Sequence, residues 1–133
     1  MLQKFAIRTT VRSGMINITE QVREAIRQSG MRDGLVIVYC PHTTAGITVN
    51  EGADPEVSGD FLRYLNQLCP WEHPIFRHGE GNSAAHIKAG IVGASQMIPV
   101  AGGKLALGAW QAIFFCEFDG PRERNFLVKI IAG

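Results

Sequence analysis

The amino-acid sequence predicts a fold of the α+β class that is mainly β: a single domain, residues 1–133, built as an antiparallel β-sandwich with two or three helices. The length is near that of one domain, and an apolar content of 46% is enough to fill one core. Seven or eight short segments have the composition of strands. The helical segments among them do not alternate regularly with the strands, which favours a sandwich over a doubly wound parallel sheet.

The first thirty residues predict a hairpin followed by a helix. Residues 5–11 are rich in β-branched side chains and end at a Ser-Gly pair, after which residues 15–18 can return as a second strand. Residues 19–29 predict a helix that Thr19 caps and Gly30 ends.

The middle of the chain predicts two strands and the clearest helix. Residues 35–40 are continuously apolar, as in a strand covered on both faces, and residues 45–49 alternate as the next strand. His42 therefore falls in the connection between two strands. An Asp-Pro pair at residues 54–55 starts a helix whose apolar side chains recur at helical intervals as far as Leu68.

The last part of the chain predicts a loop, a third helix and four strands. Residues 71–82 have no hydrophobic period, which indicates a structured loop, whereas residues 83–93 can form a helix with a stripe of small residues. The strands expected after this helix cover residues 97–100, 104–107, 110–118 and 126–131, and the first two of them form a hairpin.

Charge and cysteine usage exclude several classes of protein. The net charge is +1, and the thirteen Lys and Arg residues are scattered along the chain, so nucleic acid and acidic membrane surfaces are not the expected partners. The three cysteines are odd in number and far apart, which predicts reduced, buried thiols instead of disulfides or a zinc knuckle. Because no leader or membrane-spanning segment is visible, we expect a cytoplasmic protein.

Three histidines in polar, loop-like sequence are the strongest candidates for chemistry. His42, His78 and His86 could together bind a divalent metal such as Zn²⁺ or Mg²⁺, leaving an open position for water, with Glu51 or Glu80 as a carboxylate partner. The spacing of eight between the last two histidines forces no shared geometry. The alternative is that these histidines only cap loops by hydrogen bonds to the backbone.

A second candidate is an anion site where the third helix begins. The Gly-Asn-Ser sequence at residues 81–83 could present backbone N–H groups to a phosphate, and Lys88 one turn later would add positive charge. An ordinary helix cap is the alternative. Arg122, which follows a Gly-Pro pair, could close on an anionic ligand or belong to a solvated turn with Glu117 and Asp119.

Two further polar groups follow or interrupt apolar strands. Asn50, Glu51 and Asp54 form a cluster after the strand at 45–49, where the aspartate also fits a helix cap. Trp110 and Gln111 place a donor-rich ring and an amide near a face that we expect to be buried, and buried amides need partners. Packing of Trp110 in the core is the alternative.

Five blocks of sequence, taken in order, resemble the YjbQ family of small proteins, also called UPF0047. The resemblance covers nearly the whole chain. Two positions depart from the family pattern: Gly46 stands where a larger apolar residue is frequent, and Ala109 replaces a threonine. The blocks are His42-Thr43-Thr44-Ala45, residues 50–55 (NEGADP), residues 78–82 (HGEGN), Ala85-His86-Ile87-Lys88 and residues 103–111 (GKLALGAWQ).

The resemblance implies a jelly-roll-like sandwich that assembles as a homotrimer. It also implies a secondary thiamine-phosphate synthase activity on a small anionic or phosphorylated metabolite. By the same resemblance, His42, His78 and His86 hold a metal or relay protons, and Glu51 and Glu80 orient them or act as acid and base. Substrate contacts are expected of Asn50, Asn82, Lys88, Trp110, Gln111 and Arg122. A trimeric metal- or ligand-binding module without turnover, and a metal-dependent hydrolase, are the alternatives.

Overall fold

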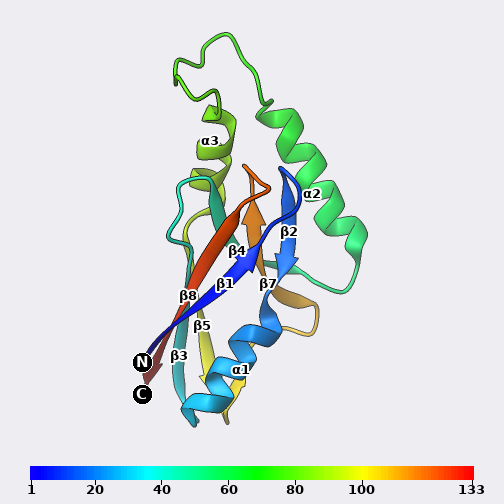
Figure 1. Ribbon diagram of the computed structural model, residues 1–133. Coiled ribbons are helices and arrows are strands. Elements are labelled where there is room, and N and C mark those ends of the chain that lie inside the picture. Colours follow the sequence, from blue (N-terminus) through cyan, green and yellow to red (C-terminus); the bar gives the residue numbers. More distant parts are fainter.

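The computed structural model describes all 133 residues as two antiparallel sheets and three helices (Figure 1). The larger sheet has the strand order β1-β8-β3-β5-β6, and the smaller has the order β2-β7-β4. The elements are β1 (Leu2–Arg8), β2 (Gly14–Asn17), α1 (Thr19–Ser29), β3 (Gly34–Tyr39), β4 (Ala45–Glu51), α2 (Pro55–Leu68), α3 (Ser83–Val92), β5 (Ser95–Ala101), β6 (Lys104–Leu105), β7 (Gln111–Glu117) and β8 (Glu123–Ala132).

Two layers of apolar side chains hold the sheets and helices together. The main core lies between the sheets, where Val36 and Phe126 of the larger sheet pack with Phe115 of the smaller one, and α1 closes one end with Val22. A second cluster joins the other face of the smaller sheet to α2 and α3. The molecule therefore has three layers, with β7 buried on both faces, and the predicted mainly β sandwich is confirmed.

The predicted helices are found close to their expected positions because their end signals are local. Asp54 caps α2 by accepting a hydrogen bond of 2.9 Å from the backbone N–H of Glu56. Gly30 ends α1 in the left-handed conformation, at a φ of 71°. Thr19 starts α1 as predicted but does not cap it, since its hydroxyl instead accepts a hydrogen bond from the N–H of Ile113.

The predicted N-terminal hairpin is wrong. β1 pairs with β8, and β2 pairs with β7, so these two neighbours in sequence belong to different sheets. The pairing of β1 with β8 also sets the two chain ends side by side (Figure 1). Sequence patterns identified the strands but could not identify their partners, because pairing depends on residues about a hundred or more positions away.

The bounds of two strands and the state of the cysteines can also be compared with the predictions. β6 spans only Lys104–Leu105, and β7 begins at Gln111, which leaves Trp110 outside the strand and 68% exposed. Cys40, Cys69 and Cys116 are free and buried, as predicted.

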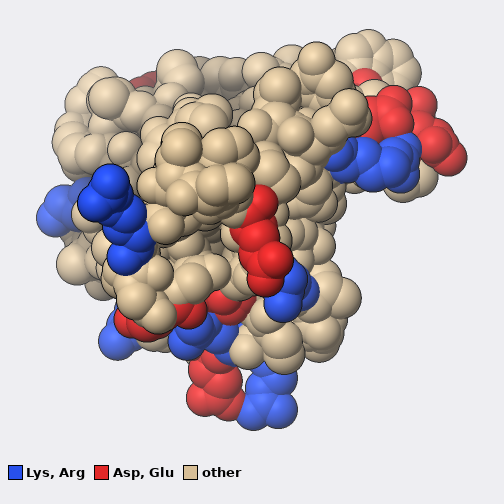
Figure 2. Space-filling view, turned by 90° about the horizontal axis from the view of Figure 1, so that it is seen from above, with Lys and Arg blue, Asp and Glu red and all other residues tan.

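None of the three helices combines the length and the apolar character that crossing a bilayer requires. On the end of the molecule shown in Figure 2, positive and negative side chains are interspersed.

Candidate functional site

Three segments that are distant in sequence surround one polar hollow of about 340 Å³. The segments are the β3–β4 connection, the start of α3 and the turn from β7 into β8. No apolar side chain of the usual core type lines this cavity, which we call the polar hollow. Its lining residues are Pro41, His42, Thr43, Thr44, Glu80, Asn82, His86, Asp119, Arg122 and Arg124.

A buried ion pair forms the wall of the polar hollow. Arg124 and Glu117 have side chains only 6% and 1% exposed. Arg124 donates from Nε to Oε1 of Glu117 at 2.8 Å and from Nη2 to Oε2 at 2.5 Å, and Nη2 also donates to the hydroxyl of Thr44 at 2.8 Å. Nη1 of Arg124 takes part in none of these bonds, although Arg124 lines the hollow. The two bonds from Nε and Nη2 to the carboxylate of Glu117 make the ion pair bidentate, which is the strongest arrangement of arginine and carboxylate.

Hydrogen bonds keep the carboxylate of Glu117 charged in spite of its burial. Burial by itself raises the pKa of Glu117, but donors from Arg124, from the N–H of Asp119 and from Thr9 outweigh that effect, so its pKa lies below the ordinary value of 4.5. The solvated turn that the sequence allowed for Glu117 is therefore wrong. Arg124 is not among the residues expected from the sequence, although it has the same strand parity as Phe126 and Val128, which face the core.

Asn82, which lines the polar hollow, has one side-chain atom without a hydrogen-bond partner. The residue is 7% exposed, and its Nδ2 donates to Oδ2 of Asp119 at 2.9 Å. The same carboxylate oxygen accepts a bond of 3.0 Å from Nη2 of Arg122. Oδ1 of Asn82 is buried without any partner, and no other buried side-chain nitrogen or oxygen in the chain is in this state. A buried acceptor without a donor costs about 1–3 kcal/mol, so this atom points to a missing partner.

His42 has a structural role that the sequence left as an alternative. Its Nε2 accepts a hydrogen bond of 2.9 Å from the N–H of Asn125, on the stretch of β8 that β3 no longer covers. Burial, and then the positive charge of Arg124, lower the pKa of His42, which favours the neutral ring. The ring thus completes the edge of β8 where the strand ladder ends.

The three histidines do not converge on one point. His78 and His86 lie edge to face, with ring centroids 5.3 Å apart, but only His86 lines the polar hollow, while His78 faces a neighbouring one. No group of three His, Cys, Asp or Glu side chains is arranged to hold a metal ion. The three-histidine metal site expected from the sequence is therefore not formed, because His42 is engaged with the backbone and His78 lies outside the hollow.

Lys88 also lies apart from the polar hollow. It is 3% exposed and donates from Nζ to Oδ1 of Asn66 on α2 at 2.5 Å, and burial lowers its pKa. Because helical periodicity turns its side chain toward α2, Lys88 does not line the polar hollow with Asn82, as the prediction of a shared anion site requires.

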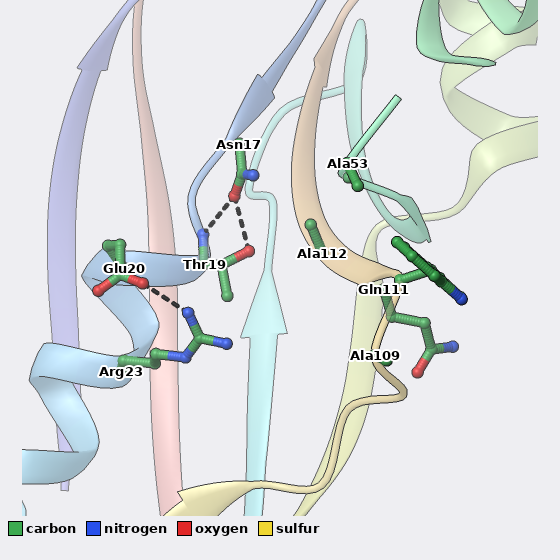
Figure 3. Close-up of a pocket in the computed structure, with 10 residues that line it drawn as sticks. Asn17, Thr19, Glu20, Arg23, Ala53, Ala109, Gln111 and Ala112 are labelled. Atoms are coloured by element: carbon green, nitrogen blue, oxygen red, sulfur yellow. Dashed lines mark hydrogen bonds and ion pairs between the residues drawn. The ribbon is translucent and has the colours of Figure 1, made fainter. Parts of the chain in front are cut away.

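The remaining expected substrate residues lie elsewhere in the fold. Glu51 accepts hydrogen bonds from the N–H groups of Ala53 and Asp54, and Asn50 accepts one from the N–H of Glu51, so both shape the β4–α2 turn. Trp110 and Gln111 line a separate hollow of about 300 Å³ beside α1 (Figure 3). Of the residues expected at a site, the structure brings together five: His42, Glu80, Asn82, His86 and Arg122.

Comparisons with known proteins agree with one another. The family model described as UPF0047 protein YjbQ-like matches residues 3–133. A UPF0047 protein of Bacillus subtilis is 52% identical, covering 98% of this chain and 99% of its own length, and one of Methanocaldococcus jannaschii is also 52% identical, covering 98% and 94%. A crystal structure of a family member from Clostridium acetobutylicum superposes with a TM-score of 0.95 at 50% identity, covering 97% of this chain and 99% of that chain.

The comparisons correct the expectation of a thiamine-phosphate synthase activity, because none of these relatives is named for it. The relatives carry only the designation UPF0047, and a similar structure from Sulfolobus solfataricus, with a TM-score of 0.95 at 31% identity, is described as a protein of unknown function. It covers 97% of its own chain and 100% of this one. With no three-ligand cluster in the chain, the metal-binding module and the metal-dependent hydrolase also lose the site on which they depended.

Proposed function

The chain belongs to the YjbQ-like UPF0047 family, whose relatives above are named without an activity, and we propose its function from the residues of the polar hollow. We propose that the hollow binds a small anionic metabolite that also carries an O–H or N–H donor, and that His86 exchanges a proton with this ligand. The unpartnered Oδ1 of Asn82 is the observation that supports this most directly. A buried amide oxygen in a polar cavity is satisfied when a ligand donates to it.

The charges around the hollow support an anion. Arg122 lies at the rim with its side chain 48% exposed, and Arg124 adds a buried guanidinium with Nη1 outside its ion pair. Guanidinium groups bind carboxylates and phosphates in a planar, bidentate manner. Glu80 and Asp119 also line the hollow, Asp119 in an ion pair with Arg122, and a ligand that is anionic at one end and a donor at the other fits both signs of charge.

His86 is the candidate for proton transfer. Its ring lines the polar hollow one turn into α3 and makes no hydrogen bond within the chain, whereas the ring of His42 is fixed on β8. Imidazole is the side chain best suited to acid–base work near neutral pH. Glu80, which also lines the hollow, is the second candidate for this work.

The donor requirement is tested with matched pairs of ligands. We expect glycolate to bind more tightly than acetate, and glycerol 3-phosphate more tightly than propyl phosphate, each by about tenfold or more, because a site built around a donor leaves Oδ1 of Asn82 unpaired without it. Titration calorimetry or the ligand-dependent rise in Tm measures this. Equal binding within both pairs would contradict the proposal.

Two variants separate binding from proton transfer. Arg122→Gln should weaken binding, whereas Arg63→Gln should not, although Arg63 forms an equivalent ion pair with an aspartate three residues before it. His86→Gln should retain binding but lose turnover of any ligand that nuclear magnetic resonance shows to be converted. If Arg122→Gln binds as tightly as the unchanged protein, the polar hollow is not the binding site.

We also propose that the protein assembles as a homotrimer. The outward face of the larger sheet supports this, because most of its central side chains are apolar although α2 and α3 pack on the other sheet. Tyr39, Met97 and Ile131 are 43%, 63% and 41% exposed on this face. The outer sheet face comprises the apolar residues Leu35, Ile37, Tyr39, Met97, Pro99, Leu127 and Ile131, with Lys129 and Lys4 among them.

A further inference from the structure

A second hollow, of about 440 Å³, is lined by residues of α1, of the loop after it and of the β5–β6 turn. In Figure 1, α1 lies at the opposite end of the molecule from the start of α3. The two cavities share no lining residue. We call the second one the basic hollow, because four of its eight lining residues are cationic and none is acidic. It is lined by Arg23, Ile26, Arg27, Arg32, Gly102, Gly103, Lys104 and Leu105.

The positive charge of the basic hollow is only partly neutralised. Arg23 pairs through Nη1 with Glu20, as Figure 3 shows, and Arg27 pairs through Nε and Nη2 with Glu24. Each of these arginines keeps N–H groups that these bonds do not use. Arg32 and Lys104 form no ion pair at all. Arg32 and Lys104 as unpaired cations, and two further arginines with free nitrogens, therefore line the same cavity. The carboxylate of Asp33 lies beside the turn and accepts a hydrogen bond of 3.4 Å from the N–H of Gly102.

The β5–β6 turn helps to place Arg32. Gly102 and Gly103 have φ values of 59° and 76°, the left-handed conformations that a two-residue hairpin turn requires. The N–H of Gly103 donates to the carbonyl of Arg32 at 2.8 Å. A Cβ at position 103 would lie 3.3 Å from Nη1 of Arg32, so the glycine lets the guanidinium lie against the turn.

We propose that the basic hollow binds a polyphosphate group, such as the di- or triphosphate of a small molecule. Like charges gathered around a cavity repel one another, and several phosphate oxygens offset this repulsion better than a single anion can. Arginine is suited to phosphate by its planar pair of donors. Nucleic acid needs a track of cations along its backbone, whereas these are confined to one cavity.

Titration calorimetry with inorganic triphosphate and with inorganic phosphate, at equal ionic strength, tests the proposal. We expect triphosphate to bind at least tenfold more tightly than phosphate. The double variant Arg32→Gln with Lys104→Gln should weaken triphosphate binding at least tenfold. The double variant Lys4→Gln with Arg63→Gln removes the same charge from other surfaces and should change the affinity less than twofold.

Three outcomes would overturn the proposal: no binding of triphosphate, equal affinity in the unchanged protein and the Arg32/Lys104 variant, or an equal loss in the control variant. Adenosine triphosphate then defines how far the site extends. Equal affinity for it and for inorganic triphosphate limits recognition to the phosphates. If adenosine triphosphate binds more tightly than inorganic triphosphate, and Trp110→Ala removes this difference, the site extends into the hollow that Trp110 lines. That hollow shares Arg23 with the basic hollow.

Discussion

Among single residues, Glu117 and Arg124 do most to define the polar hollow. Their side chains are almost fully buried, and the pair is joined by Thr9 and Thr44 into one hydrogen-bonded group. Burying two charges is unfavourable unless each is paired and its remaining hydrogen bonds are made. Here the carboxylate accepts five bonds, from the side chains of Arg124 and Thr9 and from two backbone N–H groups.

Glu117→Gln should destabilise the protein by about 3–5 kcal/mol, because it leaves the guanidinium of Arg124 buried without a counter-charge. Urea unfolding followed by circular dichroism measures the change. As a control, Glu123→Gln removes the exposed partner of Arg8 and should change the free energy of unfolding by less than about 1 kcal/mol. Equal effects of the two variants would show that burial adds nothing to the inner pair.

The pH dependence of the same experiment has a definite sign. The folded pKa of Glu117 lies below its ordinary value of 4.5, so its stabilisation is fully present above that value and is lost as the pH falls through the folded pKa. The unfolding free energies of the unchanged protein and of Glu117→Gln should therefore approach each other below about pH 4.5. A constant difference down to acid pH would contradict a charged Glu117.

Among the elements, α3 is placed by its close approach to β4. A Cβ at Gly46 would lie 2.6 Å from the carbonyl oxygen of Gly93 and 3.1 Å from a methyl carbon of Val92. The same carbonyl accepts a hydrogen bond of 3.0 Å from the N–H of Ile47. Gly46 therefore allows α3 to reach β4, and α3 carries His86 into the polar hollow.

Gly46→Ala should lower the free energy of unfolding by about 1–3 kcal/mol, because α3 or β4 must shift to make room. Gly90→Ala is the matched control within α3, since a Cβ there meets nothing within 4 Å. That change should stabilise the protein by about 0.5–1 kcal/mol, as expected for an exposed helix interior. Thermal unfolding of both variants checks the pair, and similar Tm shifts for both would refute the close-approach argument.

At the scale of the whole molecule, one surface is left without a covering layer. The smaller sheet is covered by the larger one on one face and by α2 and α3 on the other, whereas the outer sheet face has nothing against it. Contiguous apolar surface of this kind marks sites of association. A closed homotrimer would remove this surface from water in every subunit.

Met97→Lys should convert the proposed trimer to monomers, because a lysine ammonium in an apolar interface loses its hydration. Light scattering coupled to size-exclusion chromatography reports the mass directly. Leu68→Lys, on the equally exposed apolar end of α2, is the control and should leave the mass unchanged. Dissociation by the control but not by Met97→Lys would place the contact on α2 instead of on the outer sheet face.

The sequence by itself determined the class of fold, the positions of the three helices and the family, and it singled out five of the residues around the polar hollow. Its signals are local: Asp54 caps a helix, Gly30 ends one, and apolar periods mark strands. Tertiary structure alone decided that β1 leaves β2 to pair with β8, that His42 completes a strand edge, and that Asn82 retains an unpartnered oxygen. The physical reason is that strand pairing and burial are set by residues far apart in the chain, whereas caps and periods act over only a few positions.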